Sequence, residues 1–166
     1  YSFYGSGVWA NERESNLLDG AAHFYDTYEC KDGKYIAVAC IEDKFYKEML
    51  DKLEITDEKF SKQFSKDVWP ELKSKLGEKF LSKNRDEWAM IFQNSDACIT
   101  PILDLDEAPK HEHNKSRSTF IERDGVVQPN PSPRFSETPL EIKSSPKEIG
   151  EDNILISEKY NINLQN

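Results

Sequence analysis

Residues 16–46 have the sequence NLLDGAAHFYDTYECKDGKYIAVACIEDKFY, in which a hairpin pattern changes directly into a helical one. Apolar and polar side chains alternate from residue 24 to residue 41, and Asp32-Gly33 is typical of a tight two-residue turn. Such a turn would place Cys30 opposite Tyr35, and both faces of the hairpin would then carry apolar side chains. We therefore expect a hairpin that is covered on both sides.

A helix is predicted directly after this hairpin, over residues 43–53, because apolar residues recur there at spacings of three and four. Glu42 occupies the corner between strand and helix, where a side chain can leave the core. Taken alone, Glu42 is most simply interpreted as an acid that the helix dipole favours at a helix start.

Two further helices are expected downstream. The first would contain Pro70 in its first turn, after a cap at Ser65 or Asp67, and its buried stripe would extend to Leu81. Asn84 would cap the second helix.

A short strand is predicted over residues 97–103, and Pro101 should place it at a sheet edge or a strand end. A second hairpin should turn at Asp124-Gly125. The predicted fold class is α+β, with a small antiparallel sheet and packed helices.

The chain divides into three predicted parts. Residues 1–23 are interpreted as a helix end and linker, and residues 24–124 as a small α+β domain. Prolines are frequent after residue 128, so residues 125–166 are expected to form an extended arm with a helix near its end.

The composition restricts the classes of partner. The 166 residues include 31 acids and 22 Lys or Arg, so binding of a nucleic acid by the whole surface is not expected. No apolar stretch is long enough to span a bilayer. The three cysteines are interpreted as reduced thiols of an intracellular protein. Because the chain starts at Tyr1 without Met, we expect it to be part of a longer protein.

Three histidines and a basic cluster are weaker candidates for a site. His111 and His113 would need a third ligand such as Asp104 or Asp106 to hold a metal, so no metal is expected. His23 is interpreted as part of the linker and not as a base. The basic cluster could meet a phosphate, but a solvated face is the simpler interpretation; it comprises Lys110, Lys115, Arg117 and Arg123.

Aromatic residues gather in the first hairpin and the helix after it. They could line an acyl pocket, but aromatic side chains at strand or helix spacing more often pack inward, so most are expected in the core. The set comprises Tyr25, Tyr28, Tyr35, Phe45 and Tyr46.

Several segments from residue 16 to about residue 160 form a pattern through their order and spacing. They are Asn16-Leu17-Leu18-Asp19-Gly20, residues 24–28, Asp32-Gly33, Ala37-Val38, Ile41-Glu42, Phe45-Tyr46, Trp88, Ile91-Phe92, residues 96–102, 111–114, Arg117, Phe120, residues 131–139 and Gly150-Glu151. Together these segments resemble the small domain of α-methylacyl-CoA racemases, which have the family III CoA-transferase fold. The chain departs from the family pattern at two places: it has Gly20-Ala21-Ala22-His23 in place of Gly-Gly-Ala-Pro, and Arg117-Ser118 in place of Arg-Gly.

This resemblance implies an enzyme that interconverts R and S 2-methyl-branched acyl-CoA thioesters. One base removes the α-proton and a second group returns a proton to the other face. The family's His and Asp pair would lie before residue 1, so the 166-residue chain alone should be inactive. Glu42 would approach that His, fix its tautomer and stabilise its charged form.

Other expectations also follow from the resemblance alone. Coenzyme A would be part of the substrate, with no separate cofactor, and the missing large domain and a second, interlocked chain would be partners. No membrane or nucleic acid partner is implied. Relatives act in peroxisomes and mitochondria, in fatty acid metabolism and bile acid biosynthesis.

Two alternatives remain open at this point. A CoA-transferase of the same fold would use a single nucleophilic Asp in the large domain. A non-catalytic interaction domain is the other, and the abrupt start at Tyr1 argues against it.

Overall fold

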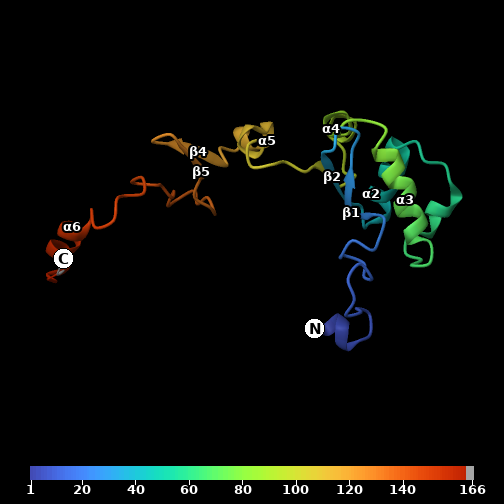
Figure 1. Cartoon of the computed structure of the whole chain (residues 1–166), viewed down its shortest axis with the longest axis horizontal. Coiled ribbons are helices and arrows are strands. Elements are labelled where there is room, and N and C mark those ends of the chain that lie inside the picture. Colours follow the sequence, from blue (N-terminus) through green and yellow to red (C-terminus); the bar gives the residue numbers. More distant parts are fainter. Residues whose placement is uncertain (164–166) are drawn as a thin grey trace. The chain divides into compact units, whose positions relative to one another are not determined.

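The structure is a computed structural model that describes residues 1–163. Internal contacts divide the chain into two units, Tyr1–Ile102 and the part from Leu103 onward. Figure 1 shows the elements of both units.

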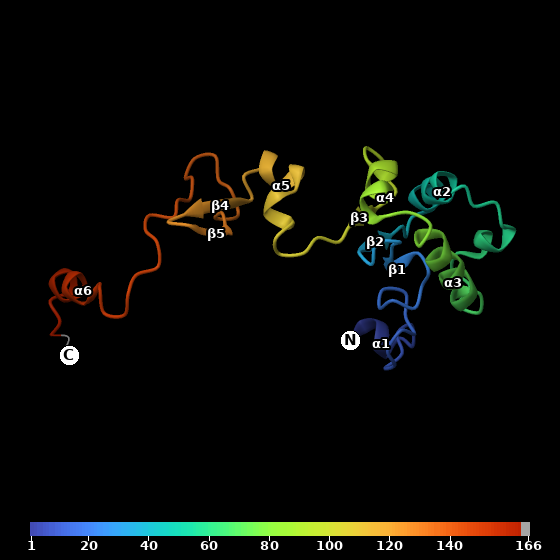
Figure 2. The same ribbon diagram turned by 45° about the horizontal axis from the view of Figure 1, so that its top comes forward.

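The first unit contains a three-stranded antiparallel sheet in the order β1-β2-β3. Its strands are β1 (Tyr25–Glu29), β2 (Tyr35–Ala39) and β3 (Ile99–Pro101). Figure 2 shows β3 beside β2, so the strand that contains Pro101 is an edge strand, as predicted.

The register of the first hairpin differs from the prediction by one residue. Glu29, and not Cys30, lies opposite Tyr35. The cause is a three-residue turn: the Gly33 N–H donates to the Cys30 carbonyl over 2.9 Å, and the Cys30 N–H donates to the Lys34 carbonyl over 2.7 Å. Gly33 has φ +74°, the left-handed conformation that closes such a turn.

This register differs from the predicted one by a single residue. The side chains of β2 that share a face with Phe24 and Tyr28 are therefore those of Ile36 and Val38, and not those of Tyr35 and Ala37. Only one face of the β1–β2 hairpin is buried within the first unit, so the expectation that both faces are covered was wrong for the described residues. The buried side chains are those of Phe24, Tyr28, Cys30, Ile36, Val38 and Cys40.

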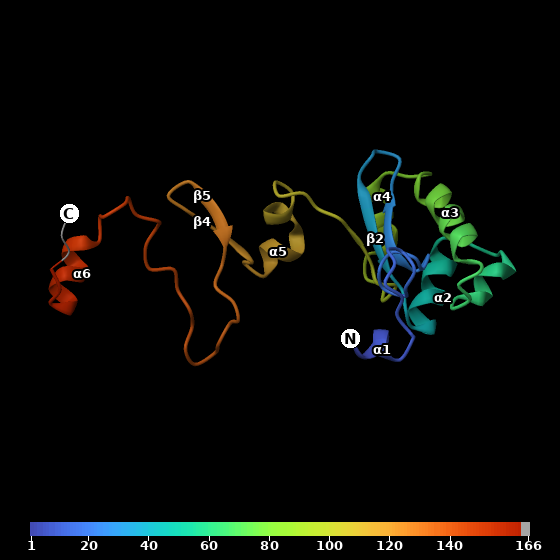
Figure 3. The same cartoon turned by 60° about the horizontal axis from the view of Figure 1, so that its bottom comes forward.

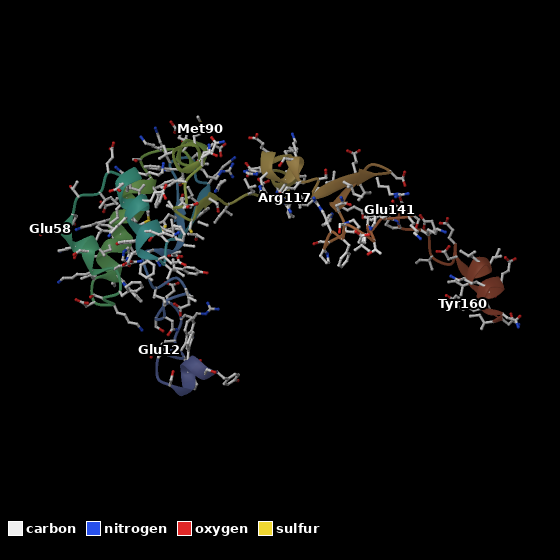
Figure 4. The ribbon with its side chains drawn as sticks, turned by 180° about the vertical axis from the view of Figure 1, so that it is seen from behind. Glu12, Glu58, Met90, Arg117, Glu141 and Tyr160 are labelled. Atoms are coloured by element: carbon white, nitrogen blue, oxygen red, sulfur yellow. The ribbon has the colours of Figure 1, made fainter. Side chains whose placement is uncertain are left out.

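Three helices contribute further buried side chains to this core. They are α2 (Asp43–Lys52), α3 (Trp69–Phe80) and α4 (Arg85–Phe92), with a short 3₁₀ helix, η1 (Glu58–Lys62), between the first two. Figure 3 shows α2 and α3 beside the hairpin. Their buried side chains include Tyr46, Met49, Leu72, Leu76, Phe80, Trp88 and Phe92, and Leu53, which directly follows α2, is also buried. Figure 4 shows Met90 on the outer side of α4, where it is exposed.

The helix starts agree with the prediction at α4 and differ at α3. The Asn84 N–H donates to the Glu87 carboxylate over 2.8 Å at the start of α4. Helix α3 instead begins after Val68 with no side-chain cap, so a cap from Ser65 or Asp67 was wrong, although Pro70 lies in the first turn. Leu81, predicted to be buried, is 49% exposed.

The N-terminal segment joins the sheet through polar contacts. After α1 (Ser2–Gly5), the buried Asn16 side chain accepts from the Ala10 N–H over 2.8 Å and donates to the Ala10 carbonyl over 3.1 Å. The Lys73 ammonium lies 2.6 Å from Asp26 and donates to the Gly20 carbonyl over 2.6 Å. The end of the predicted linker is therefore held against α3 and β1.

The second unit contains short elements joined by extended chain. They are η2 (Ala108–Lys110), α5 (Glu112–Ser116), β4 (Phe120–Arg123), β5 (Val126–Pro129) and α6 (Asn153–Tyr160). Arg123 pairs with Val126, and Asp124 and Gly125 form the two-residue turn with φ of +49° and +78°, so the second hairpin is confirmed.

The α+β prediction is confirmed by these elements. The contact boundary lies between Ile102 and Leu103, whereas the sequence placed a boundary at residue 124. The division into linker, small domain and arm of a longer protein stays a prediction, and residues 164–166 of the predicted arm lie outside the described residues. Within residues 1–163, no helix has the length and apolar character needed to cross a membrane.

A pair of glycine substitutions tests the turn. We expect Gly33→Ala to destabilise the first unit by about 1 kcal/mol, because a residue with a Cβ disfavours the positive φ of this position. Steric overlap plays no part, since the added Cβ would have no atom within 4 Å. Gly77→Ala, also unobstructed but inside α3, should stabilise it by about 1 kcal/mol. Urea unfolding followed by tryptophan fluorescence measures both, and equal effects of the two substitutions would contradict the assigned turn.

Candidate functional site

Glu42 lies at the corner between β2 and α2, as the sequence predicts. It is the residue that precedes the first turn of α2, with φ −76° and ψ 140°. Its carbonyl accepts the Phe45 N–H over 3.0 Å and the Tyr46 N–H over 2.9 Å. The backbone of Glu42 thus closes the first turn of α2, while its side chain is exposed.

The Glu42 carboxylate has no hydrogen-bond or ion-pair partner within residues 1–163, and it does not cap its own helix. The nearby Lys44 ammonium lies over the Phe45 ring, 4.3 Å from the centroid. A carboxyl group on a well-defined backbone, with no partner of its own, can therefore accept a hydrogen bond from a group outside the described residues.

The backbone before Glu42 is held by several hydrogen bonds. The Cys40 N–H donates to the Phe24 carbonyl over 2.9 Å, and the Ile41 N–H donates to the Ala39 carbonyl over 3.1 Å. The buried Gln63 amide donates to the Cys40 carbonyl over 3.0 Å and to the Ile41 carbonyl over 2.9 Å. Sequence analysis missed Gln63, because it belongs to a polar segment that has no helical or strand pattern.

The cysteines near this corner are protonated thiols. Cys40 is buried, its Sγ donates to the Ala97 carbonyl over 2.6 Å, and burial raises its pKa to about 12. Partial burial, followed by the charges of Glu42 and Asp96, raises the pKa of Cys98. Because thiolates are the nucleophilic form of cysteine, neither residue is a candidate nucleophile. Cys30 is also a free thiol, and burial raises its pKa to about 11.

His23 lies in the core and is not part of the linker, so that interpretation was wrong. Its ring is fully buried, and Nε2 lies 2.7 Å from the Tyr46 hydroxyl. That hydroxyl donates to the Phe60 carbonyl over 3.0 Å, so Nε2 must be the protonated nitrogen, and Nδ1 has no partner. Burial lowers the pKa of His23 to about 4, and the ring is neutral at pH 7.

The second unit does not assemble the other candidate residues into a site. No set of three or more His, Cys, Asp or Glu side chains is arranged to hold a metal ion in the part of the chain that the structure describes. Asp104 instead accepts hydrogen bonds from the backbone N–H groups of Asp106 and Glu107, over 2.9 and 2.8 Å.

The basic cluster includes one residue with a structural role. The Arg123 guanidinium donates to the carbonyls of Ile142 and Lys143, and it thereby joins the second hairpin to the arm. Lys110, Lys115 and Arg117 are exposed, and Figure 4 marks Arg117. Their exposure agrees with the solvated face that the sequence favours, and phosphate binding by this cluster stays an untested alternative.

The aromatic set divides between core and surface. Tyr28 and Tyr46 are buried, and Tyr28 stacks on Phe80 with ring centroids 5.2 Å apart. Tyr25 and Phe45 are half-buried and Tyr35 is exposed. Only Tyr28 and Tyr46 are core residues, so the prediction that most of the five lie in the core was wrong, although Tyr25 and Phe45 pack against the core.

Comparison with known sequences identifies the family. The sequence pattern of CoA-transferase family III matches residues 3–153 of this chain. The chain belongs to CoA-transferase family III.

Members of this family with curated names are clearly similar. An α-methylacyl-CoA racemase of Mus musculus is 39% identical over 157 residues, which are 93% of this chain and 41% of the racemase. The corresponding racemase of Homo sapiens is 41% identical over 133 residues, 80% of this chain and 35% of that protein. The chain therefore spans about two fifths of the length of these relatives.

Solved structures support the fold. A CAIB/BAIF family protein from Brucella suis superposes with a TM-score of 0.70 at 21% identity, over 95% of this chain and 42% of that one. Rv3272 from Mycobacterium tuberculosis gives a TM-score of 0.64 at 16% identity, over 81% of this chain and 39% of that one.

The buried His23 predicts a pH dependence of stability. A buried histidine whose pKa is about 4, against a usual value of 6.5, binds its proton mainly in the unfolded state. The neutral ring therefore contributes fully to the free energy of unfolding above about pH 6.5. This contribution is lost as the pH falls toward 4, and the loss amounts to about 3 kcal/mol. Urea unfolding at several pH values should show this loss.

The His23→Gln variant removes the titrating group and should lack this share of the loss. His113→Gln, which changes an exposed histidine, serves as the control and should retain it. If wild type and His23→Gln lost stability equally between pH 7 and pH 4, the neutral buried ring would be the wrong assignment.

Proposed function

We propose that this chain is the C-terminal part of an α-methylacyl-CoA racemase, which interconverts R and S 2-methyl-branched acyl-CoA thioesters. The main support is the identity of 39% over 157 residues with the Mus musculus racemase. The chain covers 41% of that relative, which agrees with a part of a longer protein. We assign one accessory acid to this part and the proton-transferring pair to the rest of the protein.

The proposed reaction exploits the acidity of the carbon next to a thioester carbonyl. A base from outside this chain removes the α-proton, an enolate forms, and a second acid returns a proton to the opposite face. Coenzyme A is part of the substrate, and the steps need no other cofactor.

Glu42 is the residue of this chain that we assign to the site. Its exposed, unpartnered carboxylate can accept a hydrogen bond from the imidazole of the catalytic His. This contact would select one tautomer of the ring and stabilise the imidazolium that forms when the ring holds the α-proton.

The partners and compartment belong to the same proposal. We expect an interlocked homodimer in which each site forms between a large and a small domain. Branched fatty acids and bile acid precursors are the proposed substrate classes, with a peroxisomal or mitochondrial location.

A CoA-transferase is the second candidate. A succinyl-CoA–L-malate CoA-transferase alpha subunit of Chloroflexus aurantiacus is 27% identical over 147 residues. Such an enzyme would move coenzyme A between two acids through a nucleophilic Asp.

Solvent exchange distinguishes the two candidates. The full-length protein should incorporate deuterium from heavy water at the α-carbon of a 2-methylacyl-CoA, and mass spectrometry of the thioester measures this. The 166-residue chain alone should give none, because we propose that the proton-transferring pair lies outside it. Transfer of coenzyme A to a second acid without α-exchange would establish the transferase instead.

A substitution at Glu42 tests the site. In the full-length protein, we expect Glu42→Gln to lower the kcat of α-proton exchange by about 10-fold to 100-fold and to change KM by less than about twofold. Asp43→Asn, at the neighbouring exposed acid of the same helix start, is the matched control and should have little effect. Equal kinetics for both variants would leave Glu42 with a helix-dipole role only.

A further inference from the structure

We propose that Gln63 is a positioning residue, which holds the backbone before Glu42 so that its carboxylate is presented to the catalytic His. This inference rests on the function proposed above, because it assigns a second residue to the same site. Gln63 acts through Glu42 and does not itself contact the substrate.

The Gln63 side chain makes two hydrogen bonds to consecutive residues of the corner. Its amide donates to the carbonyl of Cys40 over 3.0 Å and to that of Ile41 over 2.9 Å, from a position 23 and 22 residues further along the chain. The residue is only 6% exposed, so water does not readily replace these hydrogen bonds. Within residues 1–163, neither carbonyl has another hydrogen-bond donor.

These bonds define the direction in which the chain reaches Glu42. The Ile41 carbonyl belongs to the same rigid peptide plane as the Glu42 N–H, so holding the carbonyl also orients the bond to the Glu42 Cα. On the other side, the Glu42 carbonyl is held by the first turn of α2. The Glu42 backbone is therefore restrained from both sides, and mainly its side-chain torsions remain free.

Gln63 is itself held in place by the core. The Trp69 Nε1–H at the start of α3 donates to the Gln63 carbonyl over 2.7 Å. The Tyr46 hydroxyl donates to the Phe60 carbonyl over 3.0 Å and so attaches η1 to α2. Gln63 thus connects the start of α3 with the start of α2, a rigid support of the kind that a functional side chain needs.

The test is a double-mutant cycle in the full-length protein. Gln63→Met keeps the length of the side chain and removes both donors. We expect it to lower the kcat of α-proton exchange about 10-fold with KM changed less than about twofold. In the Glu42→Gln background, the same substitution should lower kcat by less than about twofold, because the residue that it positions no longer acts.

A buried hydrogen bond elsewhere in the core is the matched control. Trp88→Phe removes the bond from Nε1 to the Phe80 carbonyl, 2.8 Å long, at a site away from the corner. It should lower the unfolding midpoint, as Gln63→Met does, and leave kcat within about twofold. If Gln63→Met lowered kcat no more than Trp88→Phe, or equally in both Glu42 backgrounds, the positioning role would be wrong.

A readout independent of activity is the hydrogen exchange of the Phe45 and Tyr46 amides, which donate to the Glu42 carbonyl. Both should exchange about 10-fold faster in Gln63→Met and be unchanged in Trp88→Phe. Unchanged exchange in Gln63→Met overturns the inference even if the protein has no racemase activity. Absence of exchange at the substrate α-carbon in wild type instead overturns the proposed function.

Gln63→Glu provides a second variant if Gln63→Met does not fold. The carboxyl group that this substitution introduces can donate one hydrogen bond when it is protonated, so the ratio of the variant's kcat to that of wild type should rise as the pH falls. A ratio independent of pH, or failure of both variants to fold, would reduce Gln63 to a structural residue.

Discussion

The register of the β1–β2 hairpin is the constraint on which the first unit depends. Gly33 has the left-handed conformation that closes a three-residue turn, and the turn aligns Glu29 with Tyr35. One face of the hairpin then holds all its buried side chains, and α2, α3 and α4 pack on it. A shift by one residue would place Phe24 and Cys40 on opposite faces of the hairpin and divide the apolar surface on which the helices pack.

Polar groups inside this core define how the helices meet the sheet. Tyr46, Gln63 and Trp69 each donate to a backbone carbonyl, and these bonds attach the starts of α2 and α3 to the corner at residues 40–42. A buried donor or acceptor that loses its partner costs free energy, so these hydrogen bonds restrict the packing more than apolar contacts do. The result is a well-defined backbone at Glu42 with a side chain that remains exposed.

Much of the fold could be predicted from local patterns. Apolar spacing predicted α2, the cap at Asn84 predicted the start of α4, and Pro101 predicted an edge strand. The first register could not be predicted, because Asp32-Gly33 suits both a two-residue turn and the last positions of a three-residue turn. The two turns differ in how the strands pack against the helices, and that information is not local.

The candidate site shows the same division. The sequence by itself determined that an acid stands where β2 passes into α2, since strand and helix patterns meet at Glu42. Only the tertiary structure decided that Gln63 supports this corner and that His23 is buried and neutral. The physical reason is that hydrogen bonds between residues more than 20 positions apart, and the desolvation of a ring, depend on which elements pack together.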